Sequence, residues 1–373
     1  MQNILIYPGA LIELENLISQ NKEFRPFFVT GNSSFTTSGA KEKIEKIVNL
    51  KNPIYFSQFS PNPDIKDVKT GINLFQSSDC NVVISIGGGS VIDMAKLIIY
   101  YQNHEINENQ IKTNLDCEQV KHICIPTTAG SGSESTHFAV MYVGNTKYSV
   151  ANNKLLPEHV IIDTDLHHSQ TKYQKAVSGA DALAQSIESL WSVNSTDLSR
   201  KYSENALKTI WNSLPELIEK GSEASHIQMA VGSNLAGKAI NIAKTTAPHA
   251  FSYGITKHSG LPHGHAVSLF IPYFLNNINK VDNHNCNDSR GSHFVIDIIN
   301  KMSAIIGCSP DNIADTIKQL YTQIGLSLDL NFLKISQNAI RKTISNVNEE
   351  RLKNYPVKID VQHLQEHLLK KIK

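Results

Sequence analysis

The sequence has no apolar run that approaches the roughly 20 residues needed to cross a membrane, and it has no internal repeat. The N-terminus shows no basic stretch ahead of an apolar core, so we expect no signal peptide and no membrane partner. An excess of one charge sign is also missing, because the formal net charge is +1, and this argues against nucleic-acid binding. The five cysteines include no CxxC pair, which predicts free thiols in a reducing compartment and, with the missing leader, a cytoplasmic protein.

The sequence does have enough apolar residues for a large core, 40% of 373, and its pattern changes near the middle. Short apolar runs alternate with helical patterns over the first 163 residues, which is typical of a parallel, doubly wound sheet. Long helical patterns follow, over 180–191, 198–221 and 226–243. We therefore predict an α/β domain with a mainly parallel, Rossmann-like sheet over 1–163 and an all-helical domain over 164–373.

The expected elements of the first domain have defined limits. The predicted strands are Asn3–Tyr7, Pro26–Thr30, Ile54–Phe56, Val82–Ile86, His122–Ile125 and Val160–Ile162. The predicted helices are Glu13–Gln20, Ser38–Leu50, Ile65–Ser77 and Val91–Tyr101. A hairpin is predicted from Phe138–Val143 and Lys147–Ala151, which flank Gly144-Asn145-Thr146.

One predicted strand runs directly into three consecutive glycines, Gly87, Gly88 and Gly89, and then into Ser90 and a helical pattern. Glycines let a backbone approach a ligand closely, and the free N–H groups of a helix N-terminus bind anions. Ser90 and Asp93 have the spacing of a capping box at that N-terminus. These five residues predict a site for the pyrophosphate of a dinucleotide; a tight turn without a ligand is the alternative.

Two other polar turns follow predicted strands and are expected at the same edge of the sheet. From the turn at 126–134 we assign to cofactor binding Thr127, Thr128 and Ser131. From the turn after Thr30 we assign Gly31, Ser33 and Ser34. A carboxylate in this turn would hold a ribose 2′-hydroxyl and repel a 2′-phosphate, so its absence favours NADPH over NADH. A plain polar turn is the alternative.

The second half contains a separated set of metal-binding residue types. Asp181 and Gln185 are four residues apart, on one face of a predicted helix. His249 and His263 follow in segments of small and apolar residues. One carboxylate and two imidazoles with an open position are what a catalytic metal needs, whereas a lone histidine is more often structural.

Five segments of the sequence carry a family resemblance: GGGSVIDMAK, PTTAGSGSES, DALAQSIES and the two histidine segments. In this order they resemble the iron-containing alcohol dehydrogenase family, and the match runs over nearly the whole chain. The resemblance implies a nucleotide domain over 1–163, a metal- and substrate-binding domain over 164–373, NADPH or NADH as cofactor, and iron or zinc. It places the metal ligands on Asp181, His249 and His263. Gln185 stands where the family has a second histidine ligand, so it is expected to bind weakly or through water. Tyr253 stands where the family has a later histidine.

Within this family, three segments look most like the phosphonoacetaldehyde reductase branch: DALAQSIESLWSVNST, KTTAPHAFSYGITKHSGLPHGHAV and VNEERLKNYPVKI. That resemblance implies reduction of phosphonoacetaldehyde to 2-hydroxyethylphosphonate, with Tyr253 or His265 as proton donor. Lys244, Lys257 and His258 would hold the phosphonate; solvated lysines are the alternative. A homodimer is expected. The competing functions are a generic aldehyde reductase, a dehydroquinate-synthase-like cyclase that regenerates its NAD, and a non-enzymatic nucleotide-binding protein.

Overall fold

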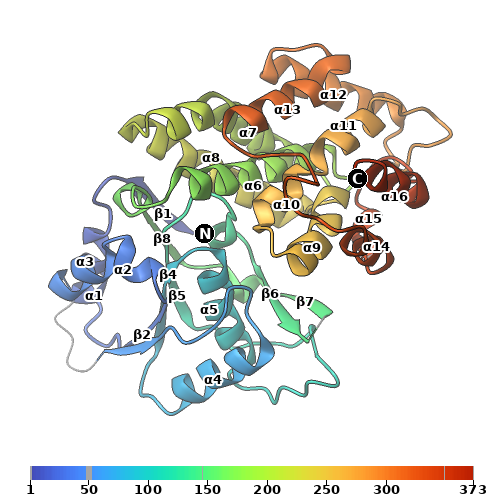
Figure 1. The fold of residues 1–373 in the computed structure, drawn as a ribbon. Coiled ribbons are helices and arrows are strands. Elements are labelled where there is room, and N and C mark those ends of the chain that lie inside the picture. The colour runs from blue at the N-terminus through green and yellow to red at the C-terminus, as the bar shows by residue number, and fades with distance from the viewer. Residues whose placement is uncertain (1, 48–52, 145, 348, 373) are drawn as a thin grey trace. The chain divides into compact units, whose positions relative to one another are not determined.

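The computed structural model describes residues 2–47, 53–144, 146–347 and 349–372, and the chain divides into two compact units, Met1–Gln170 and Thr171–Lys373 (Figure 1). The first unit extends from the predicted limit at 163 to 170. Leu166 is fully buried in its core, and His167 Nε2 lies 3.2 Å from Pro126 O, so the residues after the last strand pack on the sheet.

The N-terminal unit is an α/β structure, as predicted. Its strands are β1 (Asn3–Tyr7), β2 (Pro26–Thr30), β3 (Ile54–Phe56), β4 (Val82–Gly87), β5 (Lys121–Pro126), β6 (Phe138–Val143), β7 (Thr146–Ala151) and β8 (His159–Asp163). Its α-helices are α1 (Ile12–Gln20), α2 (Ser34–Thr37), α3 (Ala40–Ile47), α4 (Ile65–Gln76) and α5 (Gly89–Tyr101). The strand limits agree with the prediction to within one residue. The predicted helix at Ser38–Leu50 corresponds to α3, which begins two residues later at Ala40, and 48–50 lie outside the described residues. The short helix α2 precedes the predicted range and was not predicted.

Six strands form one parallel sheet in the order β1-β8-β5-β4-β2-β3. Side chains alternate between its faces: Phe27 and Val29 pack with α4 and α5, whereas Phe28 packs with α1 and α3. Burial of both faces explains why β2 and β4 read as continuous apolar runs. β6 and β7 form the predicted antiparallel hairpin, in which Val143 pairs with Thr146; Asn145 lies outside the described residues.

The C-terminal unit is helical, as predicted. Its longest helices are α6 (Lys172–Trp191), α7 (Asp197–Glu219) and α8 (Glu223–Ala243). The others are α9 (Ala247–Ser259), α10 (His263–Ser268), α11 (Ile271–Ile278), α12 (Ser292–Ile306), α13 (Ile313–Gln323), α14 (Gln337–Ser345), α15 (Glu349–Leu352) and α16 (Val361–Leu369). α6 begins eight residues before the predicted 180, because Thr171 and Gln174 form a capping box there.

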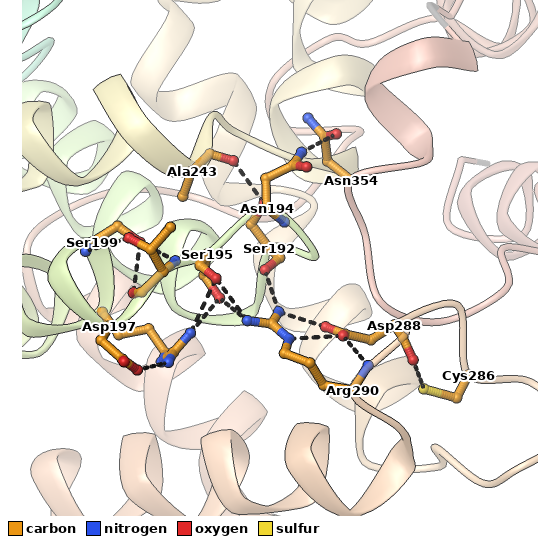
Figure 2. Close-up of polar contacts among 12 residues, drawn as sticks. Ser192, Asn194, Ser195, Asp197, Ser199, Ala243, Cys286, Asp288, Arg290 and Asn354 are labelled. Carbon is orange, nitrogen blue, oxygen red and sulfur yellow. Dashed lines mark hydrogen bonds and ion pairs between the residues drawn. The ribbon is translucent and has the colours of Figure 1, made fainter.

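A buried arginine network fixes the turn that joins α6 to α7 (Figure 2). Arg290 donates to Ser192 O at 3.0 Å and to Ser195 O at 2.7 Å, and its partner Asp288 has no exposed side-chain surface. Asn194 donates to Asn354 Oδ1 at 2.8 Å, which ties the C-terminal segment to the same turn. These bonds hold the end of α6, and α6 carries the first of the predicted metal ligands.

Candidate active site

Three loops of the N-terminal unit lie at the same edge of the sheet, because they follow the neighbouring parallel strands β2, β4 and β5. Gly31 N donates to Ile86 O at 3.3 Å, and Thr127 N donates to Gly87 O at 3.0 Å, so all three loops are joined. The chain reverses its direction across the sheet here, since β2 leads to β3 on one side and β4 leads to β5 on the other. Open α/β sheets bind ligands at such a switch point.

The three glycines of the β4–α5 turn differ in their surroundings. A Cβ on Gly87 would lie 2.5 Å from a valine side chain of α5, and a Cβ on Gly89 would lie 2.7 Å from Ser131 Oγ, so packing alone requires glycine at both. A Cβ on Gly88 would meet only Thr128, at an ordinary 3.6 Å. Gly88 therefore leaves open space beside the first N–H groups of α5, where an anion can bind.

The turn after β2 leads into α2, with Ser33 exposed and Ser34 half-buried. A Cβ on Gly31 would lie 2.0 Å from Ser34 Oγ, so a larger residue here would require the Ser34 hydroxyl to rotate away. No carboxylate stands between Gly31 and Ser34.

Ser90 and Asp93 do not form the predicted capping box. α5 begins one residue before Ser90, with Gly88 as its N-cap, and Ser90 Oγ accepts from Asn62 N at 3.2 Å. The Asp93 carboxylate accepts from Ser133 Oγ at 2.7 Å and from a backbone N–H of β6 at 3.2 Å. Asp93 thus holds the β6 segment, and the structure does not support its predicted role in cofactor binding.

Lys96, which had no predicted role, is fully buried on α5, one turn after Asp93. Its ammonium donates to Ser133 O at 2.6 Å and to Thr136 O at 2.7 Å, among other oxygens of the same segment. Burial lowers the pKa of Lys96 to about 8, while the Asp93 charge opposes that shift. A charged pair three residues apart in an otherwise apolar helix was the sequence feature that marked this site.

In the C-terminal unit, Asp181, His249 and His263 come together from the three helices α6, α9 and α10. His249 Nε2 lies 3.2 Å from Asp181 Oδ1, and His263 Nε2 lies 3.9 Å from the same oxygen. Two atoms that each bind one ion at about 2.1 Å are at most about 4.2 Å apart, so both separations fit a shared metal. A carboxylate and two imidazoles suit iron or zinc.

Two local features allow these helices to meet. Pro248 lies in the first turn of α9, where its missing N–H costs no hydrogen bond, and His249 follows it. A Cβ on Gly264 would lie 2.1 Å from Val177 O and 3.0 Å from Asp181 Cβ, so only glycine lets α10 approach α6 this closely.

Glu188, which the sequence analysis also gave no role, orients His249. Its carboxylate is fully buried on α6 and accepts a hydrogen bond from His249 Nδ1. The same carboxylate accepts from Thr246 N and Thr246 Oγ1, both at 2.9 Å, and Thr246 Oγ1 in turn accepts from Trp191 Nε1. Because Glu188 holds the proton on Nδ1, Nε2 is the nitrogen that faces Asp181 and that can bind a metal once it gives up its own proton. Glu188 stands seven residues after Asp181, on the same helix face, and this spacing could have revealed it.

The charges of the cluster depend on one another. Burial raises the pKa of Asp181, but a hydrogen bond with His249 and the charges of His263 and His249 outweigh it, so the pKa is lowered overall. Gln185 contributes a further hydrogen bond to Asp181 that lowers this pKa. Burial lowers the pKa of His249, whereas Glu188 and Asp181 raise it, to about 10. Gln185 is therefore engaged with Asp181 one turn away, as its place on the helix predicted.

The two predicted proton donors have different surroundings. The ring of Tyr253 stacks on His263 with centroids 5.1 Å apart, so Tyr253 borders the cluster. His265 is buried; its Nδ1 lies 2.9 Å from Tyr173 Oη and its Nε2 lies 2.7 Å from Ser327 O. Because both ring nitrogens are hydrogen-bonded within the protein, the structure does not support the predicted role of His265 as proton donor.

The predicted phosphonate-binding cations are not gathered at the cluster. Lys257 and His258 are exposed in the last turn of α9, and Lys257 is about 12 Å along the helix axis from His249. Lys244 is the exposed C-cap residue of α8. The cation that the structure does bring close is Arg351 on α15, whose guanidinium carbon lies 5.8 Å from the centroid of the Tyr253 ring.

Comparison with known proteins agrees with this geometry. The family model described as iron-containing alcohol dehydrogenase matches residues 2–164, and the model of the C-terminal part of that family matches residues 175–372. The chain belongs to the iron-containing alcohol dehydrogenase family. Within the described residues, no helix has the length and apolar character to span a membrane.

Three relatives illustrate the likeness. Long-chain-alcohol dehydrogenase 1 of Geobacillus thermodenitrificans is 30% identical over 60% of this chain, and the match spans 58% of that relative, less than two thirds of its length. The phosphonoacetaldehyde reductase of Streptomyces viridochromogenes is 26% identical over 73% of each chain. The sulfoacetaldehyde reductase of Bifidobacterium kashiwanohense, solved in complex with NAD+, superposes with a TM-score of 0.87 at 26% identity and covers 99% of this chain and 96% of its own.

Proposed function

We propose that this protein is an NAD(P)-dependent, metal-assisted oxidoreductase that interconverts a small aldehyde and the matching alcohol. The observation that carries the proposal is the convergence of Asp181, His249 and His263, with Glu188 holding the imidazole tautomer that a metal requires. Membership of the iron-containing alcohol dehydrogenase family supports the same reaction class.

In this proposal each part of the chain has a defined task. Asp181, His249 and His263 hold a divalent metal, iron or zinc, which when bound supplies a Lewis acid that polarises a carbonyl oxygen. Glu188 orients His249, and Gln185, which is hydrogen-bonded to Asp181, binds the ion weakly or through water. Tyr253, stacked on His263, supplies the proton for the alcohol oxygen. Residues 1–163 form the nucleotide-binding domain, and residues 164–373 form the metal- and substrate-binding domain. The protein is proposed to be a homodimer, and sedimentation equilibrium would measure its mass.

For the cofactor, we propose that the three joined loops bind the dinucleotide and that NADPH is preferred. The free space at Gly88 supports a pyrophosphate at the start of α5. The absence of a carboxylate from Gly31 to Ser34 supports tolerance of a 2′-phosphate. Titrating both cofactors against intrinsic fluorescence tests the preference, and clearly tighter NADH binding would refute it.

For the substrate, we propose phosphonoacetaldehyde. Two of the similar proteins are named for short aldehydes that carry an acidic group, a phosphonate in one and a sulfonate in the other. Arg351 is the cation that we propose holds this group, because it packs on Tyr253 and donates to Thr245 Oγ1 at 2.9 Å, next to the cluster. Lys244, Lys257 and His258 would contribute a weaker, longer-range attraction.

The test compares NADPH oxidation with phosphonoacetaldehyde, sulfoacetaldehyde and propanal, with and without added iron or zinc. We expect kcat/KM for phosphonoacetaldehyde to exceed that for propanal by at least about tenfold, or about 1.4 kcal/mol in transition-state binding. Arg351→Met should remove most of that ratio and leave propanal reduction unchanged, whereas Lys208→Met, a surface control on α7, should change neither. Equal rates for phosphonoacetaldehyde and propanal would leave a generic aldehyde reductase, and a dominant rate with sulfoacetaldehyde would reassign the acidic group.

A further inference from the structure

The C-terminal unit contains a second pocket that the proposed reaction does not use. It has a volume of about 510 Å³ and lies among α11, α13, α16 and the segment 328–330. Among the described residues, neither the metal cluster nor its supporting side chains line it. A cavity of this size is within the range that holds a small organic ligand, roughly 300–1,000 Å³.

Positive charge enters this pocket from three separate elements. Lys280 follows α11, Lys318 lies on α13 and Lys371 follows α16, while His363 and His367 lie on α16 itself. The negative end of the α16 dipole accounts for basic residues in its last turn, but not for Lys318, which lies in the middle of another helix. No carboxylate is among the described residues that line the pocket.

The nearest carboxylates in the sequence are directed elsewhere. Asp360 caps α16 by accepting from His363 N at 2.9 Å. Asp329 accepts from two backbone N–H groups of its own loop, at 2.8 and 3.3 Å. Asp315 pairs with the lining cation Lys318 at 2.7 Å, and its side chain is largely exposed, so screening weakens the pair.

The cations also repel one another across the pocket. Burial lowers the pKa of His367, and the charges of Lys371, His363 and Lys318 lower it further. Burial and the charge of Lys318 lower the pKa of Lys371 as well. Like charges held together cost stability, and a bound anion would relieve that cost.

Apart from Asn276 and Asn277, the remaining wall of the pocket is apolar or aromatic. It includes Leu328, Leu330 and Leu368, and the latter two are buried. Tyr273 adds an aromatic surface, because its ring centroid lies 5.1 Å from that of His367 and its hydroxyl lies 3.0 Å from His363 Nδ1. A ligand that fits both walls has an anionic head and an apolar or aromatic body.

We propose that this pocket binds a small organic phosphate, with the phosphoryl group among Lys280, Lys318 and Lys371 and the apolar body against the leucine wall. A dianion matches three ammonium groups better than a monocarboxylate does, and lysine is a common phosphate partner.

Isothermal titration calorimetry of the full chain with phenyl phosphate tests the proposal, with inorganic phosphate and phenol as partial probes. Phenyl phosphate is expected to bind more tightly than either partial probe. The double variant Lys280→Gln/Lys371→Gln should weaken its binding by at least about tenfold, since it removes two of the three ammonium groups that would donate charge-assisted hydrogen bonds to the phosphoryl oxygens. The matched double variant Lys208→Gln/Lys220→Gln, with both lysines exposed on another helix and its end, should bind normally.

Two further variants distinguish binding in this pocket from binding at the nucleotide loops. Asn276→Trp places a bulky ring at an exposed lining position and should block binding without removing a buried contact. Gly88→Val should leave phenyl phosphate binding intact. The proposal is overturned if phenol binds as tightly as phenyl phosphate, if both lysine double variants bind normally, or if Gly88→Val alone abolishes the binding.

Discussion

Replacing Glu188 with glutamine is expected to weaken metal binding while the protein stays folded. In the native protein one fully buried carboxylate accepts from His249 Nδ1, Thr246 N and Thr246 Oγ1. An amide of the same shape has one oxygen and one NH2 group. Whichever way it turns, the NH2 group meets an N–H, either that of His249 Nδ1 or that of Thr246.

If the amide nitrogen faces His249, the imidazole must move its proton to Nε2, and the lone pair that a metal needs is lost. If it faces Thr246, that backbone donor loses its acceptor, at a cost of about 1–3 kcal/mol. Loss of such an outer hydrogen-bond partner typically weakens metal affinity by about 10–100-fold. Glu188→Ala removes the whole carboxylate and should cost more stability, about 3–5 kcal/mol, because several buried donors lose their partner together.

The assay is competition of the apoprotein against a fluorescent chelator for zinc, with thermal unfolding of each apoprotein measured beside it. Glu188→Asp should recover part of the affinity, since it restores a carboxylate, and the exposed Glu219→Gln on α7 should match the native protein. Native zinc affinity in a folded Glu188→Gln protein would refute the orienting role of this carboxylate.

Four other outcomes are expected. Gly88→Val should fold normally yet lose dinucleotide binding, because its Cβ position is free of clashes inside the protein but would occupy the space of the pyrophosphate; fluorescence titration with NADPH that matches the native protein would contradict this. Lys96→Met should lower the free energy of unfolding by about 3–5 kcal/mol, since it removes a buried cation that donates to Ser133 O and Thr136 O and whose charge stabilises the buried Asp93 carboxylate; urea denaturation measures the loss, and a change below 1 kcal/mol would be inconsistent with this role. Gln185→His should tighten zinc binding by at least about tenfold, or about 1.4 kcal/mol, by adding a ligand, whereas Gln185→Leu should not. Burial lowers the pKa of His122 to about 3, below its ordinary 6.5, so between these values the unfolded chain binds more protons than the folded one and stability falls as pH falls. Between pH 7 and pH 5 the native protein should therefore lose about 2 kcal/mol more free energy of unfolding than His122→Gln does. Equal losses in the two proteins would rule out His122 as the source.

The limits of the strands could be predicted from the sequence to within one residue, whereas their order in the sheet came from the structure. Parallel strands that are buried on both faces appear as continuous apolar runs, and glycine or polar turns bound them. The same local patterns placed the three loops at the carboxyl edge of the sheet, because the ends of parallel strands necessarily lie together. The metal set was predicted from residue type and from the resemblance to the iron-containing alcohol dehydrogenases.

Predictions that depended on a side chain's direction were less successful. Asp93 was expected at the cofactor and instead holds β6, and α5 begins at Gly89, two residues earlier than a Ser90 N-cap requires. His265 lies two residues after a proposed ligand, yet its ring nitrogens contact Tyr173 and Ser327. A helix turns 100° per residue, so proximity in the chain does not place two side chains in one site.

By itself the sequence determined the two-part architecture, the glycine turn at the end of β4 and the identity of Asp181, His249 and His263 as a candidate metal set. Only the tertiary structure revealed that His249 Nδ1 donates to Glu188, and that Lys96 donates to oxygens of the segment after β5. Only the tertiary structure, too, placed Lys318 of α13 in one pocket with Lys280 and Lys371, which follow α11 and α16. These relations join residues 37 to 61 positions apart or lie between separate helices. Local periodicity reports which face of an element is buried, whereas the partner on that face is chosen when the elements pack.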